Sequence, residues 1–408
     1  MLIDVKISNF LSIGDEVILS LDSGPGKKLS ENMIAISGRE NLLRSAVIYG
    51  ANASGKSNII KGIHFMRNMV LNSHKFNIDS RIPVVPFKFG EKGGKKASIF
   101  EIRFIHENVR YRYGFSCTDS KVIEEYLYHR PQKRERLVFS RTNTSEYKFG
   151  SKEKKQQEQL KDQTIDNTLY LSRATQLGFE GTKKAYEFFS KYLVINYDPA
   201  WSDYTISQMS HDRQLKEKVL EILKAADFGG IEDIIIEKKH AANEGFLLKE
   251  EPFSFHKDEK EKFSVSFLHR TADNKLIGLD LSEESEGTRR TLALLGPVFD
   301  ILENGKVAFI DELELSLHPS ITRFLVRLFN SKKNEKNAQL IFTTHNTSLL
   351  DNELFRKDQI YFCSKEPNRN TELYSLLEYD IRQDADFERA YLTGRVGGLP
   401  FIDETAFF

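Results

Sequence analysis

One short motif, GANASGKS at residues 50–57, constrains the chain more than any other feature. The apolar stretch at 45–49 before it predicts a strand, and apolar residues spaced three or four apart from Ile59 to Val70 predict a helix after it. Glycines in such a loop let backbone N–H groups surround phosphate oxygens, and the start of the helix adds partial positive charge. The motif therefore predicts a phosphate-binding loop for ATP, in which Lys56 reaches the β- and γ-phosphates and Ser57 holds Mg²⁺. The expected nucleotide-binding residues are Gly50, Ala51, Asn52, Ala53, Ser54, Gly55, Lys56, Ser57 and Asn58.

Two adjacent carboxylates, Asp311 and Glu312, end another apolar stretch that predicts a buried strand. Ligands of open α/β sheets bind at the carboxyl ends of the strands, where these side chains are expected. One carboxylate can hold the water shell of a metal ion, and we assign this role to Asp311, together with Ser57. The other can orient an attacking water, and we assign this catalytic role to Glu312. The combination predicts attack of water on the γ-phosphate of ATP.

The rest of the chain shows two kinds of pattern. Alternating polar and apolar residues at 2–10 and from 97 to 140 predict strands, which are antiparallel in the second stretch, whereas the polar residues 141–167 are expected to form an exposed loop. Amphipathic stretches between 181 and 228 predict the helices of a helical lobe. From residue 282 onward helices and apolar strands alternate, which is typical of a parallel sheet covered by helices. The expected fold class is α/β, with a mixed sheet, an antiparallel β subdomain and a helical lobe.

The charges of the chain balance, with 59 Lys and Arg against 59 Asp and Glu. No net charge therefore draws the whole molecule to nucleic acid or to an anionic membrane, and any nucleic-acid contact needs a local patch. The cysteines, Cys117 and Cys363, exclude a disulfide framework and suit a reducing compartment. No apolar run approaches the roughly 20 residues of a membrane helix. We expect a cytoplasmic protein without a membrane partner.

The motifs, in this order, resemble those of ABC-type ATPases, specifically the soluble branch that includes SMC-like and OLD-type proteins. Four further segments match: ISNF at 7–10, the signature SEGT at 285–288, SLHP at 316–319 and TTHN at 343–346. The resemblance implies a head-to-tail homodimer in which Ser285 and Gly287 of one chain contact the nucleotide held by the other. It also implies a catalytic role for His345, in contact with the γ-phosphate. A simple helix N-cap by Ser285 is the alternative interpretation of SEGT.

Closer still, the chain resembles the AAA15-type, RloA and AbiL-like predicted ATPases of bacterial phage-defence and abortive-infection loci. The segments GANASGKSN, SEGTRR, DELELSLHP, TTHN and YLTGRVGGLPFID carry this resemblance. It implies an ATPase that acts in antiviral defence, as a homodimer or higher oligomer, and controls a separate effector such as a nuclease. The alternative is a DNA repair or maintenance ATPase that acts directly on nucleic acid. The balanced charge and the lack of long coiled-coil repeats favour the first.

The resemblance also implies how the chain is divided. Residues 1–140 would form the N-terminal part of the ATPase lobe, 141–280 a polar loop, the helical lobe and an insertion, and 281–408 the C-terminal part of the ATPase lobe. A glutamine commonly contacts the metal where such lobes join, and Gln176 is the candidate. OLD-type nucleases carry a further metal-binding domain, for which the residues after His345 are too few. We assign no chemistry to the terminal segment at 391–401, where packing or partner docking is expected.

Overall fold

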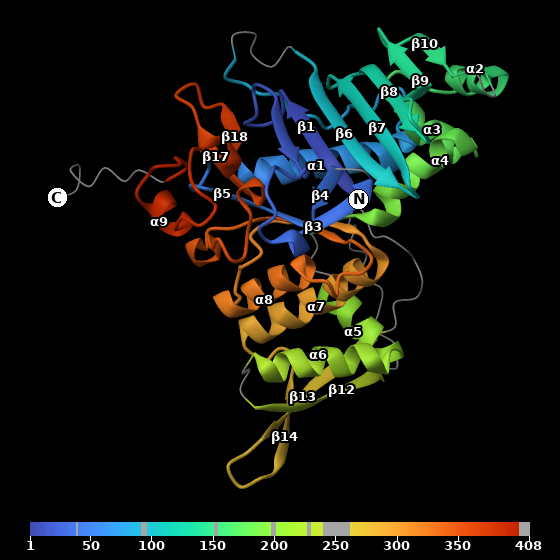
Figure 1. The fold of residues 1–408 in the computed structure, drawn as a ribbon. Coiled ribbons are helices and arrows are strands. Elements are labelled where there is room, and N and C mark those ends of the chain that lie inside the picture. Colours follow the sequence, from blue (N-terminus) through green and yellow to red (C-terminus); the bar gives the residue numbers. More distant parts are fainter. Residues whose placement is uncertain are drawn as a thin grey trace. The chain divides into compact units, whose positions relative to one another are not determined.

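The computed structural model of the chain describes residues 1–37, 40–90, 96–150, 154–196, 201–226, 230–239 and 262–399 (Figure 1). The chain groups into two compact units. The first comprises Met1–Tyr197, Ile301–Glu314 and Thr322–Phe408, and the second comprises Asp198–Asp300 and Leu315–Ile321. The boundaries of these units differ from those of the three expected segments, 1–140, 141–280 and 281–408. Residues 240–261, which belong to the expected insertion, lie outside the described residues.

The first unit contains an antiparallel sheet, a mainly parallel sheet and a two-stranded sheet. The antiparallel sheet consists of β1 (Leu2–Ser8), β2 (Val17–Ser20), β6 (Ser98–His106), β7 (Val109–Cys117), β8 (Val122–Arg130), β9 (Arg136–Thr142) and β10 (Glu146–Phe149). The parallel sheet consists of β5 (Ser45–Gly50), β11 (Leu193–Asn196), β15 (Val307–Ile310), β16 (Gln339–Thr343), β17 (Ile360–Lys365) and β18 (Thr371–Ser375). The small sheet pairs β3 (Met33–Ser37) with β4 (Glu40–Leu43).

The helices of the first unit are α1 (Lys56–Asn72), α2 (Lys154–Asp162), α3 (Tyr170–Gln176), α4 (Glu180–Glu187) and α9 (Phe387–Leu392). Its shorter helical segments are η1 (Ser30–Asn32), η2 (Ser73–Lys75), η3 (Phe188–Tyr192), η4 (Thr347–Leu349), η5 (Lys357–Gln359) and η6 (Leu376–Glu378). Two helices, α7 (Glu286–Asn304) and α8 (Pro319–Asn330), contain residues of both units. Among the described residues, none of the helices has the length and apolarity needed to span a bilayer.

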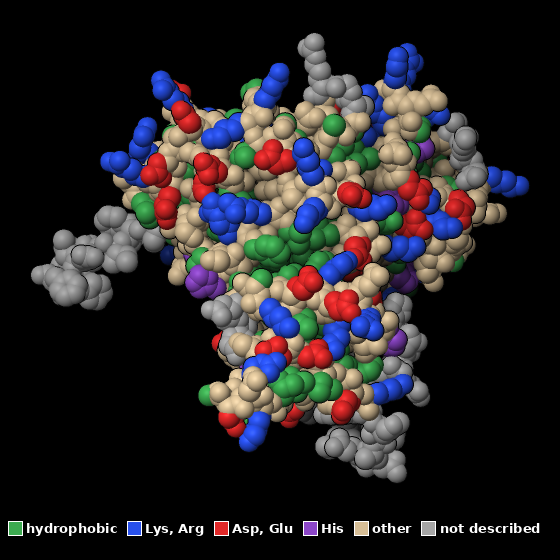
Figure 2. All heavy atoms as spheres, turned by 60° about the horizontal axis from the view of Figure 1, so that its bottom comes forward, with side chains coloured by type: hydrophobic (Ala, Val, Ile, Leu, Met, Phe, Trp, Pro, Cys, Tyr) green, Lys and Arg blue, Asp and Glu red, His purple; other side chains and the backbone are tan. Residues whose placement is uncertain are grey.

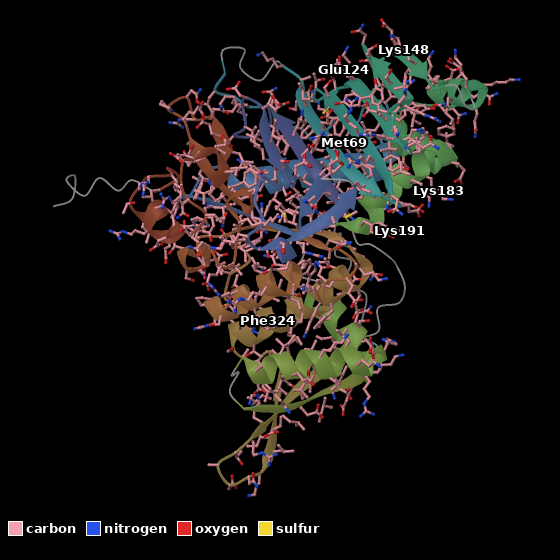
Figure 3. The ribbon with its side chains drawn as sticks, viewed as in Figure 1. Met69, Glu124, Lys148, Lys183, Lys191 and Phe324 are labelled. Carbon is pink, nitrogen blue, oxygen red and sulfur yellow. The ribbon has the colours of Figure 1, made fainter. Side chains whose placement is uncertain are left out.

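The antiparallel sheet confirms the alternation seen between residues 97 and 140. Its strand order is β10-β9-β8-β7-β6-β1-β2, and β6 to β9 form successive antiparallel pairs. Met69 on α1 is buried in the core that the sheet covers, whereas Glu124 on β8 and Lys148 on β10 are exposed (Figure 3). The sheet therefore buries one face and leaves the other to solvent, as its alternating pattern requires.

The parallel sheet has the strand order β11-β15-β16-β5-β17-β18 and confirms the expected α/β class. Its central strand β5 is buried along its whole length and pairs parallel with β16 on one side and β17 on the other. The outer strand β18 runs antiparallel to β17. Because β5, β15 and β16 run in the same direction, their carboxyl ends share one edge of the sheet.

Helix α1 lies between the two large sheets, because it contacts β1 of one and β5 of the other. Ile59, Ile60, Ile63 and Met66 are buried along it, which confirms the predicted apolar spacing. At Gly62 the helix comes so near to β1 that a Cβ would lie 2.6 Å from Ile7 Cδ1. This close packing holds the phosphate-binding loop at the start of α1 in a fixed position.

A buried carboxylate joins the antiparallel sheet to α3. Glu125 on β8 is fully buried and accepts hydrogen bonds from the N–H groups of Tyr170 at 2.6 Å and Leu171 at 2.9 Å, and from the Tyr113 hydroxyl at 3.0 Å. Burial raises the pKa of Glu125, and these donors act in the opposite direction. The carboxylate satisfies two N–H groups at the start of α3, each of which would cost about 1–3 kcal/mol if buried without a partner.

The second unit contains helices α5 (Trp201–His211) and α6 (Arg213–Ala225) and an antiparallel sheet of β12 (Ile231–Lys239), β13 (Lys262–Arg270) and β14 (Leu276–Asp280). The Asp212 side chain caps α6 by accepting the N–H groups of Gln214 and Leu215, at 2.8 and 3.1 Å. An ion pair of 3.0 Å between Lys216 and Asp233 joins α6 to β12. The expectation of helices between 181 and 228 is confirmed, although α4 belongs to the first unit.

Two local predictions are wrong. The stretch 141–167, expected to be an exposed loop, contains β10 and α2. Only Gln157 and Leu160 of α2 are buried, so the helix has too few apolar residues to show a periodic pattern. The first of the helices expected between 181 and 228 ends as α4 at Glu187, continues as the π-helical segment η3, and Leu193 begins β11.

Candidate nucleotide site

The loop before α1 has the backbone that its glycines predict. Gly50, Ala53 and Gly55 have φ values of 154°, 62° and 112°. A side chain on Gly55 would overlap the Thr371 hydroxyl, and one on Gly50 would overlap the backbone of β17. The Ser54 hydroxyl is buried and has no hydrogen-bond partner among the described residues. This narrow cradle with an unsatisfied donor fits phosphate oxygens.

Lys56 begins α1 and points back into the loop. It is 5% exposed, and its ammonium donates hydrogen bonds to Gly50 O at 2.8 Å and to Ala51 O at 3.1 Å. Burial lowers the pKa of Lys56, while the negative charges of Asp311 and Glu312 act in the opposite direction. The structure therefore brings the lysine and the carboxylates together at one edge of the sheet, although about 250 residues separate them in the sequence.

Asp311 and Glu312 follow β15 and are held by a residue of the neighbouring strand. The Thr343 hydroxyl donates to Asp311 Oδ1 at 2.6 Å and accepts the Glu312 N–H at 2.8 Å. Glu312 has a positive φ of 50°, and both carboxylates are half-buried. Ser57, in the first turn of α1, and Asp311 offer the hydroxyl and carboxylate oxygens that Mg²⁺ prefers. The donor set thus fits the predicted ion.

His345 lies just beyond β16 and is exposed. Its backbone N–H donates to the side chain of Glu314, three residues after Asp311. The next residue, Asn346, accepts a hydrogen bond of 3.1 Å from the hydroxyl of Tyr49, which precedes the loop. The structure therefore holds the histidine backbone beside the segment that contains Glu312, while the imidazole remains accessible.

Sequence reasoning missed a hydroxyl network beside the loop. The Asn58 amide donates to Ser12 Oγ at 2.6 Å, and Ser12 Oγ lies 2.8 Å from Thr371 Oγ1. The Thr371 hydroxyl is also 3.0 Å from the carbonyl oxygen of Ser54. Ser12 and Thr371 lie outside every motif, so only the pairing of distant strands could have indicated them. Thr343 belongs to the TTHN segment, but that segment did not indicate its hydrogen bonds to Asp311 and Glu312.

A pocket of about 230 Å³ adjoins this network. Its lining includes Asn58, Leu11, Val85 and Phe89. The Phe89 ring packs against the guanidinium of Arg369, with 5.1 Å between the ring centroid and Arg369 Cζ. An apolar surface beside an aromatic ring and a planar cation suits a flat heteroaromatic base.

Gln176 does not belong to this site, so its expected metal contact is wrong. It is exposed at the end of α3 and accepts a hydrogen bond of 2.9 Å from Arg173. Ser172, one turn earlier, hydrogen-bonds at 3.0 Å to His74, two residues after the end of α1. Ser57 lies at the first turn of α1, about 20 Å away for a helix of this length. The sequence pattern around Gln176 predicts a helix but does not indicate how far that helix lies from Ser57.

The signature residues lie in the second unit, at the start of α7. The Ser285 hydroxyl accepts the Thr288 N–H at 3.1 Å, so Ser285 does cap the helix. Ser285 is exposed and Gly287 half-buried. Ser316, in the SLHP segment, donates to Glu286 at 2.7 Å, which joins two of the matched segments within this unit.

The terminal segment packs on the parallel sheet. The Tyr391 ring stacks on Phe362 of β17 at 5.4 Å, and its hydroxyl donates to Gly398 O at 3.2 Å. The Tyr374 hydroxyl of β18 donates to Val396 O at 3.1 Å. The expected packing role is therefore confirmed for residues up to 399, whereas 400 and 401 lie outside the described residues.

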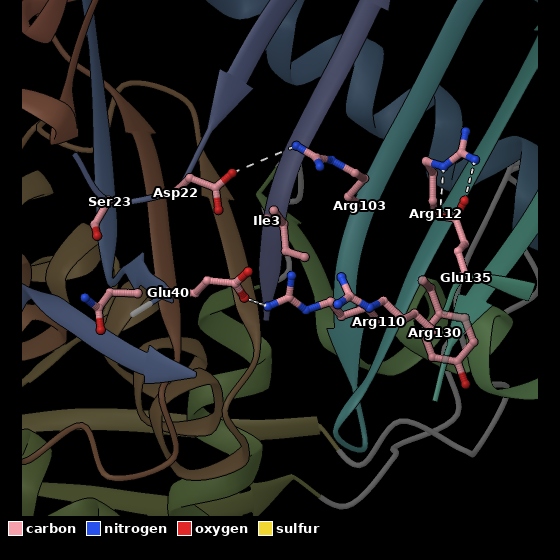
Figure 4. Close-up of a pocket in the computed structure, with 11 residues that line it drawn as sticks. Ile3, Asp22, Ser23, Glu40, Arg103, Arg110, Arg112, Arg130 and Glu135 are labelled. Carbon is pink, nitrogen blue, oxygen red and sulfur yellow. Dashed lines mark hydrogen bonds and ion pairs between the residues drawn. The ribbon is translucent and has the colours of Figure 1, made fainter. Parts of the chain in front are cut away.

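A groove of about 450 Å³ on the antiparallel sheet is lined by four arginines (Figure 4). Arg103 pairs with Asp4, Arg110 with Glu40 and Arg112 with Glu135. Side chains of both charge signs are also interspersed over the face in Figure 2. Neither surface offers the excess of positive charge that binding to a nucleic-acid backbone requires.

The geometry defines a phosphate-binding loop, with a lysine and two carboxylates, at the carboxyl edge of a parallel sheet. It is the site of a P-loop ATPase domain. The sequence agrees, because residues 45–351 match the AAA_21 family, described as "AAA domain, putative AbiEii toxin, Type IV TA system". The chain belongs to this family. The narrower grouping with AAA15-type, RloA and AbiL-like proteins remains a prediction.

Solved structures of SMC heads align with the chain at 13% sequence identity. An SMC head bound to the C-winged helix domain of ScpA has a TM-score of 0.45 and covers 92% of this chain and 97% of that one. The SMC head domain from Thermotoga maritima has a TM-score of 0.39, with 92% and 98% covered. An Smc head with an extended coiled coil, bound to the C-terminal domain of ScpA from Pyrococcus furiosus, has a TM-score of 0.45, with 97% and 98% covered. No curated protein gives a significant match.

Replacing Lys56 with alanine should weaken ATP binding at least about tenfold, because the loop loses its buried cation for the phosphates. The measurement is a calorimetric titration with ATP and Mg²⁺. Lys61→Ala is the matched control, since Lys61 is exposed on the same helix and should leave the affinity unchanged. Parent-like affinity in Lys56→Ala would contradict the assignment of the loop.

Proposed function

We propose that this chain hydrolyses ATP as a homodimer and thereby controls a separate effector, such as a nuclease, in an antiviral defence system. The observation that supports hydrolysis best is the arrangement of Lys56, Asp311 and Glu312 at one edge of the parallel sheet. Phosphate-binding and water-activating groups are both needed for attack on the γ-phosphate, and both are present here.

The loop binds the phosphates. The N–H groups of the loop and the Ser54 hydroxyl bind the phosphate oxygens, and Lys56 exchanges its hydrogen bonds to Gly50 O and Ala51 O for bonds to the β- and γ-phosphates. The adenine occupies the pocket beside Asn58 and Phe89. Ser57 and Asp311 hold Mg²⁺, which neutralises charge on the phosphate oxygens when it is bound.

Glu312 orients the attacking water and accepts its proton. The Glu312 N–H donates to the Thr343 hydroxyl, which holds the Glu312 backbone at the end of β15 and so positions its carboxylate. His345 contacts the γ-phosphate from the end of the neighbouring strand, with its backbone held by Glu314. Water attacks phosphorus in line with the bond to the leaving ADP, and the products are ADP and inorganic phosphate.

The second half of each site comes from another copy of the chain. Ser285 and Gly287 lie at the exposed start of a long helix, where N–H groups and the helix dipole favour an anion. The link between Ser316 and Glu286 supports a joint action of the two segments. In this proposal ATP holds the dimer together and hydrolysis releases it.

Substitution of the two carboxylates should separate binding from chemistry. Glu312→Gln should bind ATP normally but turn over about 10²–10⁴-fold more slowly, because the amide cannot accept the proton of the water. ATP-bound dimer should then accumulate in sedimentation experiments. Asp311→Ala should instead weaken binding of Mg-ATP. Equal turnover by Glu312→Gln and the parent chain would refute the role of Glu312.

Ser285→Arg should leave ATP binding by an isolated chain nearly intact but remove dimerisation and turnover, because the arginine obstructs the approach of the partner's phosphates. Ser210→Arg is the control, since Ser210 is an exposed serine on α5 in the same unit.

A mixture of Ser285→Arg and Lys56→Ala chains offers a sharper readout, because the heterodimer contains one intact site. Up to about half the activity per dimer returns if the sites act independently, and none if they are coupled. Full activity of Ser285→Arg alone would mean that SEGT is only a helix cap.

The effector proposal rests on the resemblance to defence-locus ATPases and on the balanced charge of the chain. The rate of ATP turnover distinguishes it from the DNA-repair alternative. Duplex DNA should leave the rate unchanged, because neither the arginine groove nor the face in Figure 2 offers excess positive charge. A protein encoded beside this chain should alter the rate. Stimulation by DNA, without any effect of that protein, would favour the repair function.

A further inference from the structure

Three potential metal ligands meet where the β6–β7 hairpin approaches the end of α4. His106 ends β6, Glu107 follows it in the turn, and Glu187 is the last residue of α4. One ligand atom from each side chain lies within 4.8 Å of the other two. All three residues belong to the first unit, and none of them takes part in the nucleotide site.

The histidine of this cluster is buried with an unsatisfied ring nitrogen. His106 is only 6% exposed, and its Nε2 has no hydrogen-bond partner among the described residues. Glu187 Oε2 is 3.7 Å from this nitrogen, which is too far for a hydrogen bond. Burial lowers the pKa of His106, against the effect of Glu107. Buried ring nitrogens normally have a partner, so this nitrogen is available to bind a ligand.

The two carboxylates of the cluster are paired with two lysines, of which Lys184 is half-buried and Lys191 is exposed. Lys184 Nζ lies 2.7 Å from Glu107 and 3.4 Å from Glu187, and Lys191 Nζ lies 3.5 Å from Glu187 (Lys191 is labelled in Figure 3). Surface ion pairs are typically worth less than about 1 kcal/mol. A divalent cation can therefore replace the lysines and, unlike them, also satisfy His106 Nε2.

We propose that His106, Glu107 and Glu187 bind a divalent transition-metal ion of the zinc type. One imidazole nitrogen and two carboxylates form a mixed set that zinc accepts, whereas Mg²⁺ prefers oxygen ligands alone. The ion joins the turn of the β6–β7 hairpin to the end of α4 and thereby stabilises the antiparallel sheet against that helix.

Zinc titration of the full-length chain tests the site. The chain is first freed of metal with a chelator and then supplied with excess Mg²⁺, which occupies oxygen-only sites, before Zn²⁺ is added in a calorimeter. We expect one Zn²⁺ per chain, and at least about a tenfold loss of affinity in Glu187→Gln and in His106→Gln. Lys184→Ala should bind Zn²⁺ more tightly than the parent chain, because it removes the competing cation.

Two controls separate this site from other effects. His211→Gln removes an exposed histidine of the second unit and should bind Zn²⁺ like the parent. Thermal unfolding shows whether each variant is folded. If His106→Gln does not fold because His106 is buried, the Zn²⁺ affinity of Glu187→Gln still tests the site. Absence of bound Zn²⁺ in the parent chain, or parent-like affinity in Glu187→Gln, would overturn the site.

Discussion

The parallel pairing of β5 with β16 and β17 is the constraint on which the rest of the structure depends. Because all six residues of β5 are buried, the strand has one position and one direction in the sheet. This direction places the loop at 50–57 at the same edge as Asp311 and Thr343. The chemistry of the site thus follows from strand order.

This arrangement also explains the burial and hydrogen bonds of Lys56. Burial disfavours its charge, and hydrogen bonds to two loop carbonyls compensate in part. A nucleotide offers more negative charge than those carbonyls do, so in the proposed function Lys56 would exchange a weak set of contacts for a strong one. The unsatisfied hydroxyl of Ser54 would gain a partner in the same exchange.

Local sequence patterns predicted the parts of the fold that local chemistry determines. The loop at 50–57 needs glycines at fixed positions, and apolar strands before acidic residues indicated the edge of the sheet. The pattern could not indicate Thr371 or the hydrogen bond of Thr343 to Asp311, because both depend on the pairing of distant strands. Gln176 was misplaced for the same reason, since only tertiary contacts put α3 at the far end of α1.

We propose that one chain alone cannot complete the catalytic site. The rate of ATP turnover per chain, measured over a wide range of protein concentration at saturating Mg-ATP, tests this claim most directly. A site shared by two chains predicts that the rate per chain rises with concentration and then reaches a plateau as dimers form. A rate per chain that stays constant down to concentrations at which sedimentation shows only monomer would contradict the account.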